Sequence, residues 1–271
     1  MMAYRHSLAV VVLLALSFGA AQGETVTAQT VVQRCDLDTY AGDDNRSRLT
    51  VMLRDAGGNE KKNVYRRYWK NYAADKGDVF DKMVLVTEFP LDAKGTGFMR
   101  WAYKPEAGRD VDQWLYLPSL KKIRRVSVRD PADRFLGSDL SYWDISLRLA
   151  EQDEHRLVEE RQQGGKTIYV VETRPREKSP LYSRLVARYE RAGDWRDCNK
   201  TRIEYFDPNG VLLKVQTLSW QKVSDAWLWD TVEVRNRKTG HSSVFQVSDV
   251  AINVGLKDRL FTERSLKRGI R

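Results

Sequence analysis

The stretch "GFMRWAYK" at residues 97–104 shows most clearly how this chain folds. Successive side chains of a β-strand point to opposite faces, so these eight letters describe two different surfaces. The two surfaces hold Met99, Trp101 and Tyr103 on one side, and Phe98, Arg100, Ala102 and Lys104 on the other. Such alternation is typical of an antiparallel sheet with one apolar face and one more solvent-exposed face.

Similar strand signals recur along the whole chain. Ten segments are rich in β-branched and aromatic residues, and we expect each to be a strand: 48–55, 81–89, 97–104, 112–118, 166–174, 183–190, 201–207, 211–221, 227–236 and 242–250. Glycine-containing turns separate several of them, namely "DAGGN" (55–59), "QQGGK" (162–166), "DPNG" (207–210) and "RKTG" (237–240). The order predicts a mostly β fold built from a meandering antiparallel sheet: a barrel, part of a barrel, or a sandwich.

Two of these strands are apolar on both faces. "DKMVLVTEF" (81–89) and "WLYL" (114–117) therefore lie at the centre of the sheet, or something covers its outer side there. Helical signals are confined to residues 24–34 and 133–150, the second with Ser138 as a plausible N-cap. An apolar helix at 133–150, following apolar strands, predicts a lid over the concave side of the sheet.

The N-terminus has the layout of a secretory signal peptide. Arg5 precedes a short apolar run and then small residues, and the run is too short to span a bilayer comfortably. Cleavage after Gly23 fits best, and cleavage after Ala21 is the alternative. We therefore expect residues 1–23 to be a signal peptide and residues 24–271 to form a single exported β domain.

The redox state of the two cysteines depends on export into an oxidising compartment. Cys35 and Cys198 either form one disulfide, worth about 4–5 kcal/mol in the chain-entropy model, or remain two buried thiols. Lipid attachment at Cys35 is rejected, because the charged Arg34 precedes it and the apolar run ends well before it.

Charge and motif content narrow the class of function. The net charge is +9 with a pI near 9.5, and both signs are interspersed. This balance suits membrane headgroups or an acidic partner and argues against nucleic acid. Outside the signal peptide the only histidines are His155 and His241, which we expect at the solvated surface, and no nucleophile, metal or phosphate motif is recognisable. We expect no catalytic residue, cofactor or metal, and a lipid hydrolase using either histidine is the weakest alternative.

Four blocks make the chain resemble a known family. They are "DQWLYLPSLKKIRRVS" (112–127), "FLGSDLSYWDI" (135–145), "YFDPNGVLLKVQTLSW" (205–220) and "GLKDRLFTERSLKRG" (255–269). Over about Asp36 to Lys267 the chain resembles the LolA-like proteins, outer-membrane lipoprotein-sorting proteins. The resemblance implies an unclosed antiparallel β-barrel whose concave apolar face is covered by short helices.

The resemblance also implies a function. Proteins of this kind carry lipoprotein acyl chains or lipids through the periplasm, and members of this branch accompany RND/MMPL-type inner-membrane transporters. We also expect a monomer, because the sequence gives no sign of an obligate oligomer, and a transient contact with the membrane surface. The alternative in the same architecture is an envelope-stress sensor, which binds acyl chains and a membrane regulator.

Twelve residues follow as predicted site residues. We expect four strand aromatics to line the concavity: Trp101, Tyr103, Trp114 and Tyr116. Four residues would belong to the covering segment: Phe135, Leu136, Tyr142 and Trp143. Four cations would form a rim that meets headgroups or an acidic transporter surface: Lys121, Lys122, Arg124 and Arg125. The plain alternatives are that the aromatics are core and that the cations are a solvated strand end.

Overall fold

Thirteen strands follow one another in a single antiparallel sheet. The computed structural model describes residues 25–126, 132–146, 148–176 and 181–270, so the predicted signal peptide (1–23) and its cleavage site at Gly23 lie outside the described residues. The strands are β1 (Asp44–Arg54), β2 (Glu60–Asn71), β3 (Val79–Phe89), β4 (Gly97–Tyr103), β5 (Asp112–Leu117), β6 (Lys122–Val126), β7 (Asp153–Gln163), β8 (Lys166–Pro175), β9 (Arg184–Arg191), β10 (Cys198–Phe206), β11 (Leu212–Val223), β12 (Ala226–Asn236) and β13 (Ser242–Ile252).

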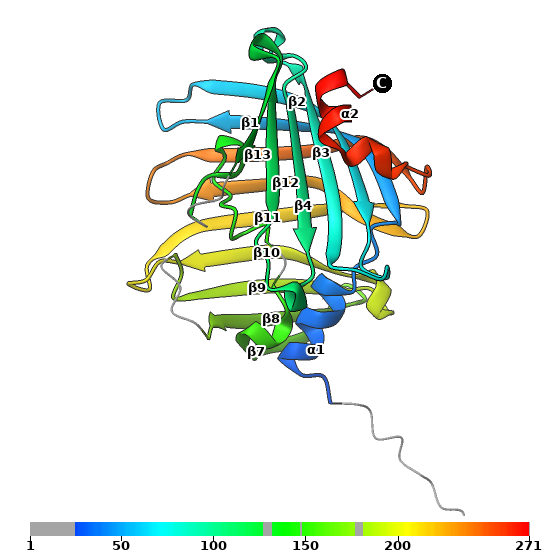
Figure 1. Ribbon diagram of the computed structural model, residues 1–271. Coiled ribbons are helices and arrows are strands. Elements are labelled where there is room, and N and C mark those ends of the chain that lie inside the picture. The colour runs from blue at the N-terminus through cyan, green and yellow to red at the C-terminus, as the bar shows by residue number, and fades with distance from the viewer. Residues whose placement is uncertain (1–24, 127–131, 147, 177–180, 271) are drawn as a thin grey trace, which may run out of the picture.

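The sheet curls strongly without closing. Its strand order is β6-β5-β4-β3-β2-β1-β13-β12-β11-β10-β9-β8-β7, so β6 and β7 are its two edges. Figure 1 shows β3 and β4 running across the front of the strands from β13 to β7, which lie behind them at a steep angle. Right-handed twist accumulated over so many strands produces this curl. The predicted unclosed antiparallel half-barrel is confirmed.

The predicted turns join neighbouring strands. The four glycine-containing turns close the hairpins β1–β2, β7–β8, β10–β11 and β12–β13. Gly164 and Gly165 have φ angles of 57° and 76°, which side chains with a Cβ rarely adopt. In the first turn both carboxylate oxygens of Asp55 accept hydrogen bonds from Asn59. Local turn chemistry therefore sets the register of these pairs.

Three strands were not predicted from the sequence. β2 carries six charged residues, which hides its alternation. The edge strands β6 (KIRRV) and β7 (DEHRLVEERQQ) are also charge-rich. Charged side chains on free edges discourage pairing with other chains, so the missing apolar pattern has a physical reason.

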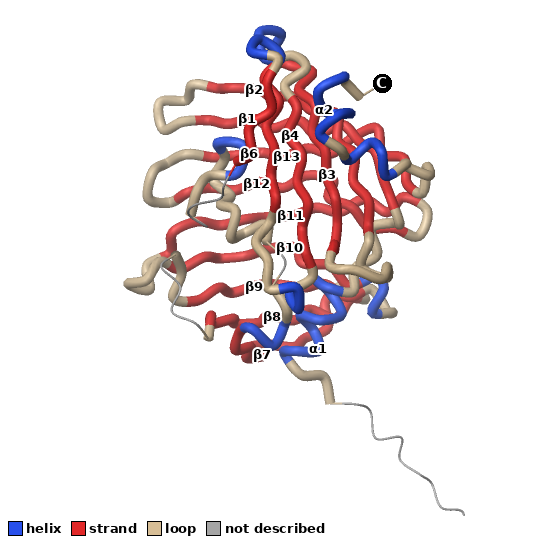
Figure 2. Tube along the Cα trace, in the orientation of Figure 1, coloured by secondary structure: helices blue, strands red, loops and turns tan. Residues whose placement is uncertain are grey.

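Helices are short and lie at the periphery of the sheet, as Figure 2 shows. The predicted N-terminal helix is α1 (Ala28–Val32), which continues as a turn of π-helix, η1 (Gln33–Leu37), and buries Val31 completely. The short 3₁₀ turns are η2 (Leu91–Ala93), η3 (Pro105–Ala107), η4 (Pro118–Leu120), η5 (Phe135–Gly137), η6 (Ala150–Gln152), η7 (Trp195–Asp197) and η8 (Asp258–Phe261). A second helix, α2 (Glu263–Arg268), follows η8 near the C-terminus. Of the described helices, none has the length and apolarity needed to cross a membrane.

The predicted helix at 133–150 is wrong. Its described residues form only η5, η6 and turns, and Leu136 takes a left-handed φ of 53°. Ser138 does not start a helix; its backbone is extended, and its Oγ accepts a hydrogen bond from the Leu140 amide at 3.1 Å. Side-chain hydrogen bonds to nearby backbone compete with helix formation and stabilise turns instead.

The outer face of the sheet is covered near β3–β5. Phe261 and Leu266, from η8 and α2, are buried against Val84 and Met99, and Trp114 packs beside them. Figure 1 shows α2 lying over this part of the sheet. A Cβ on Gly97 would lie 2.5 Å from Leu266 Cδ1, so α2 sits close to β4 because residue 97 is glycine. This explains why two strands there are apolar on both faces.

Candidate functional site

A large cavity lies inside the curl of the sheet. Its volume is about 1040 Å³, at the upper end of the range for small-molecule sites. The strands β9–β12 supply an apolar wall that consists of Leu185, Ala187, Ile203, Leu218, Trp220 and Trp229. Val32 and Leu37, from α1 and η1, line another part of it. This part of the cavity wall is apolar enough to contact a hydrocarbon chain.

A polar wall is contributed by β3–β5. Asp81, Arg100 and Gln113 line the cavity there. One guanidinium nitrogen of Arg100 donates to both carboxylate oxygens of Asp81, at 2.7 and 2.9 Å, and both side chains are largely buried. Gln113 is fully buried on the neighbouring strand, directly opposite Arg100.

Three of the four predicted lining aromatics lie elsewhere. Trp101, Trp114 and Tyr116 pack on the outer face with η8 and α2, so their predicted position in the concavity is wrong. Trp101 and Trp114 make an edge-to-face contact there, with ring centroids 5.3 Å apart. Tyr103, at the end of β4, does line the cavity, and its hydroxyl donates to Asp112 at 2.6 Å. The inward face of β4 is the one with Arg100 and Ala102.

The covering segment, defined as residues 133–146 and 148–150, lines one side of the cavity. Tyr142 and Trp143 line it, as does Ile145. Phe135 and Leu136 belong to the hydrophobic core. The ring of Phe135 stacks on that of Phe245 of β13, with ring centroids 6.5 Å apart. A cargo-binding role of the four predicted residues of this segment stays a prediction.

Two buried aspartates attach the covering segment to the sheet. Asp144 Oδ2 accepts from Lys214 Nζ of β11 at 2.5 Å, and both side chains are almost completely buried. The Tyr182 hydroxyl donates to Asp144 Oδ1 at 2.9 Å, and burial, reinforced by the Asp144 charge, raises the pKa of Tyr182. Asp139 Oδ2 accepts from Ser243 Oγ of β13 at 2.7 Å. The segment is therefore fixed by charged hydrogen bonds as well as by apolar packing.

The predicted basic rim is on the free edge of the sheet. Lys121 lies in the turn before β6, and the other three residues lie on that edge strand; all four are exposed. Arg125 lines the cavity and forms an ion pair with Asp112. Docking of headgroups or a partner at these cations stays a prediction.

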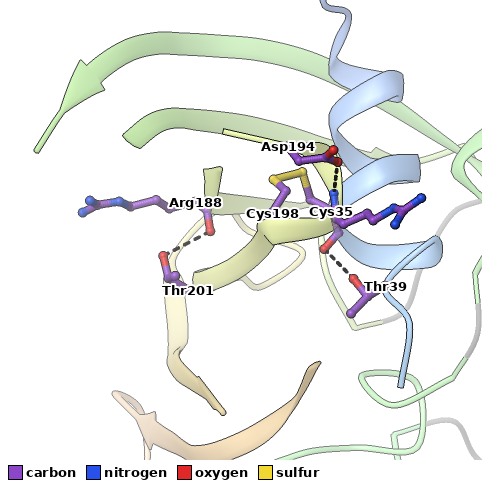
Figure 3. Close-up of a disulfide and its surroundings, with 7 residues drawn as sticks. Cys35, Thr39, Arg188, Asp194, Cys198 and Thr201 are labelled. Atoms are coloured by element: carbon purple, nitrogen blue, oxygen red, sulfur yellow. Dashed lines mark hydrogen bonds between the residues drawn. A yellow bond between two sulfur atoms is a disulfide. The ribbon is translucent and has the colours of Figure 1, made fainter. Parts of the chain in front are cut away.

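A disulfide joins Cys35 to Cys198 and fixes the N-terminal helix on the sheet. The Cα atoms are 4.7 Å apart, and the linked residues are 163 positions apart in sequence. Figure 3 shows the bridge between η1 and the start of β10, beside Asp194. Asp36 adds an ion pair with Lys200 of β10. The sequence left a disulfide and two buried thiols as alternatives, and the structure has the disulfide.

His155 is not the solvated residue expected from its charged surroundings. It is half-buried at the cavity wall, where Nε2 donates to the Ala150 carbonyl at 2.8 Å. Nδ1 then accepts from the Thr173 hydroxyl at 2.9 Å. Burial lowers the pKa of His155 below its ordinary value, against the opposing effect of the Ala150 carbonyl. The folded protein therefore holds a neutral imidazole here.

This histidine predicts an acid-sensitive stability. The unfolded chain takes up a proton at His155 near pH 6.5, whereas the folded chain resists protonation until lower pH. Stability is thus expected to fall as pH drops through about 6.5, and His155→Gln should remove this part of the dependence. Urea midpoints of both proteins between pH 8 and pH 5 measure it. Parallel midpoint curves for the two proteins would contradict the assignment.

Comparison with known proteins agrees with this architecture. A family model described as "Uncharacterized protein" matches residues 80–268, more than half of the chain. A search of curated proteins found no match. A putative outer membrane lipoprotein-sorting protein domain from Vibrio parahaemolyticus is 26% identical with a TM-score of 0.73, over 89% of this chain and 98% of that one.

Two further solved structures are similar. A DUF1329 family protein from Desulfovibrio piger is 27% identical with a TM-score of 0.72, over 87% of this chain and 95% of the other. A LolA superfamily protein from Nitrosomonas europaea shares the fold, with 18% identity and a TM-score of 0.60, over 89% and 100% of the two chains. The chain therefore belongs to the family that the matching model describes, and its fold is LolA-like.

Proposed function

We propose that the protein is a periplasmic carrier, which binds lipoprotein acyl chains or lipids in its cavity and exchanges them with an envelope transporter. The observation that carries this proposal is the cavity of about 1040 Å³ with its apolar wall on β9–β12. The similarity to a lipoprotein-sorting protein domain supports it. Carriage of this kind needs no catalytic group, only an apolar surface that replaces the bilayer.

The energetics explain why such a surface is required. Exposing one CH₂ group to water costs about 0.8 kcal/mol, so a chain of roughly sixteen carbons costs on the order of 13 kcal/mol. A lipid that crosses an aqueous compartment therefore has to stay in an apolar cavity. Tyr142 and Trp143 of the covering segment contribute aromatic surface to that cavity.

Export and partners complete the proposal. The signal peptide at residues 1–23 would deliver the chain to the periplasm. The exposed cations Lys121, Lys122, Arg124 and Arg125 would meet anionic headgroups or an acidic surface of an RND/MMPL-type transporter. Their place on the free edge strand β6 leaves them accessible to such a surface.

Native mass spectrometry tests the proposal. The mature protein, purified from its own periplasm without detergent, is expected to carry a bound mass that fragments to acyl chains. An empty protein that also refuses fluorescent acyl probes would overturn the carrier function.

A pair of matched tryptophan variants locates the binding surface. Trp229→Ser opens the apolar wall of the cavity and is expected to weaken acyl-probe binding by about 10-fold or more, since it removes a large apolar contact. Trp114→Ser makes the same change on the outer face and should leave probe affinity unchanged. Probe titrations on both variants, with circular dichroism to verify folding, measure the difference. Equal losses in the two variants would argue against this cavity as the acyl site.

A further inference from the structure

The polar wall of the cavity contains hydrogen-bond donors that the described residues leave without acceptors. Arg100 Nε and the Gln113 side-chain amide are buried, and none of these atoms has a hydrogen-bond partner in the part of the chain that the structure describes. Gln113 is 0% exposed, and both residues line the cavity. A buried donor without an acceptor costs about 1–3 kcal/mol, so a bound group that supplies an acceptor to this pair would be favoured.

The two donors lie side by side. Arg100 and Gln113 are directly paired across β4 and β5, which places their Cβ atoms about 5 Å apart on one face. Arg100 Nε and Gln113 Nε2 can therefore reach two oxygens of one small group. Gln113 Oε1 remains to accept from a water or a hydroxyl.

A second guanidinium group lies on the same side of the sheet. Arg67, on β2, faces the same side, and its guanidinium donates to Asn45 Oδ1 at 2.6 Å. Burial and, to a smaller extent, the Arg100 charge lower the pKa of Arg67 to about 10, and the Asp81 charge opposes both effects. Because a pKa of about 10 is well above 7, Arg67 stays cationic at neutral pH. The Asp81 carboxylate thus pairs with Arg100 and also acts electrostatically on Arg67.

We propose that this wall binds the anionic head of an amphiphile, a carboxylate or a phosphate monoester, through Arg100 and Gln113. The apolar wall on β9–β12 would hold its hydrocarbon chain. An anion fits because it can accept from both donors, whereas a cationic head would face Arg67 and Arg100. This inference rests on the proposed carrier function and specifies its ligand class.

Four probes with one chain length and different heads test it: lauric acid, dodecyl phosphate, dodecanol and dodecyltrimethylammonium. Calorimetric titration of the wild-type protein is expected to show the acid or the phosphate binding about 10-fold to 100-fold more tightly than dodecanol. The tighter of the two anions identifies the head. Equal affinities for all four probes would leave the carrier function standing and overturn the head site. Binding of none of them would overturn both.

Two variants and a control assign the effect to this wall. Gln113→Leu removes an unpartnered buried amide, so it should fold normally while the preference for the anion over dodecanol falls several-fold. The double variant Arg100→Met with Asp81→Asn removes the donor together with its own carboxylate partner, and it should weaken the preference. Arg66→Met, on the opposite face of β2 and paired with Glu88, should keep it. An unchanged preference in both cavity variants would contradict the proposal.

Discussion

Replacing Lys214 by methionine is expected to lower the free energy of unfolding by about 3–5 kcal/mol, because it leaves the Asp144 carboxylate buried without its cation. The ammonium group of Lys214 donates to Asp144 Oδ2 at 2.5 Å and to the Asp139 carbonyl at 2.8 Å. The exposed fractions of the two side chains are 4% and 0%, so water cannot replace the lost partner. Urea unfolding of the variant and the wild type, compared at equal m-value, measures the loss.

A double-mutant cycle separates the ion pair from general packing. Lys214→Met combined with Asp144→Asn removes both charges while an amide oxygen can still accept from Tyr182, so the double variant should lose less than the sum of the single losses. Arg134→Met is the matched control. Arg134 pairs with Asp139 of the same covering segment. The Asp139 carboxylate is 2% exposed but keeps a hydrogen bond from Ser243, and the Arg134 side chain is 47% exposed, so we expect a smaller loss than for Lys214→Met. Similar losses for Lys214→Met and Arg134→Met would refute the buried ion pair.

This ion pair illustrates what the sequence could and could not predict. Lys214 occupies an inward position of β11, between Leu212 and Gln216, and a lysine there was a signal that an acidic partner lies inside. The partner lies 70 residues earlier, in a segment whose apolar residues suggested a helix. Distance in the sequence hides such pairs, since no local periodicity connects them.

The prediction of which face of β4 lies in the concavity was wrong for a related reason. Hairpin turns and alternation predicted the strands and the half-barrel, because those signals are local. Both faces of β4 carry aromatic residues, and the more aromatic face, with Trp101, turned out to be covered by α2. The inward face holds Arg100, whose polarity suggested solvent. Which face is concave depends on where the C-terminal helix packs, about 165 residues further on, and alternation alone does not contain that information.

Loss of the disulfide is expected to be the largest single perturbation. Cys35 and Cys198 close a loop spanning 163 residues, and in the chain-entropy model the bridge restricts the unfolded chain by about 5 kcal/mol. We therefore expect Cys35→Ser with Cys198→Ser to lower the free energy of unfolding by about 4–5 kcal/mol. Urea unfolding of the double variant, compared with reduced and oxidised wild type, measures it. The reduced wild type should match the variant.

The same variant separates stability from cavity integrity. Val31 is fully buried, and Asp36 still pairs with Lys200, so the N-terminal helix retains contacts of its own after the bridge is removed. If those contacts suffice, acyl-probe affinity stays near the wild-type value while the unfolding midpoint falls. If the helix detaches, Val32 and Leu37 leave the cavity wall and probe affinity falls as well. A loss of less than about 1 kcal/mol in the double variant would mean that the bridge adds little, and that the unfolded chain is already restricted without it.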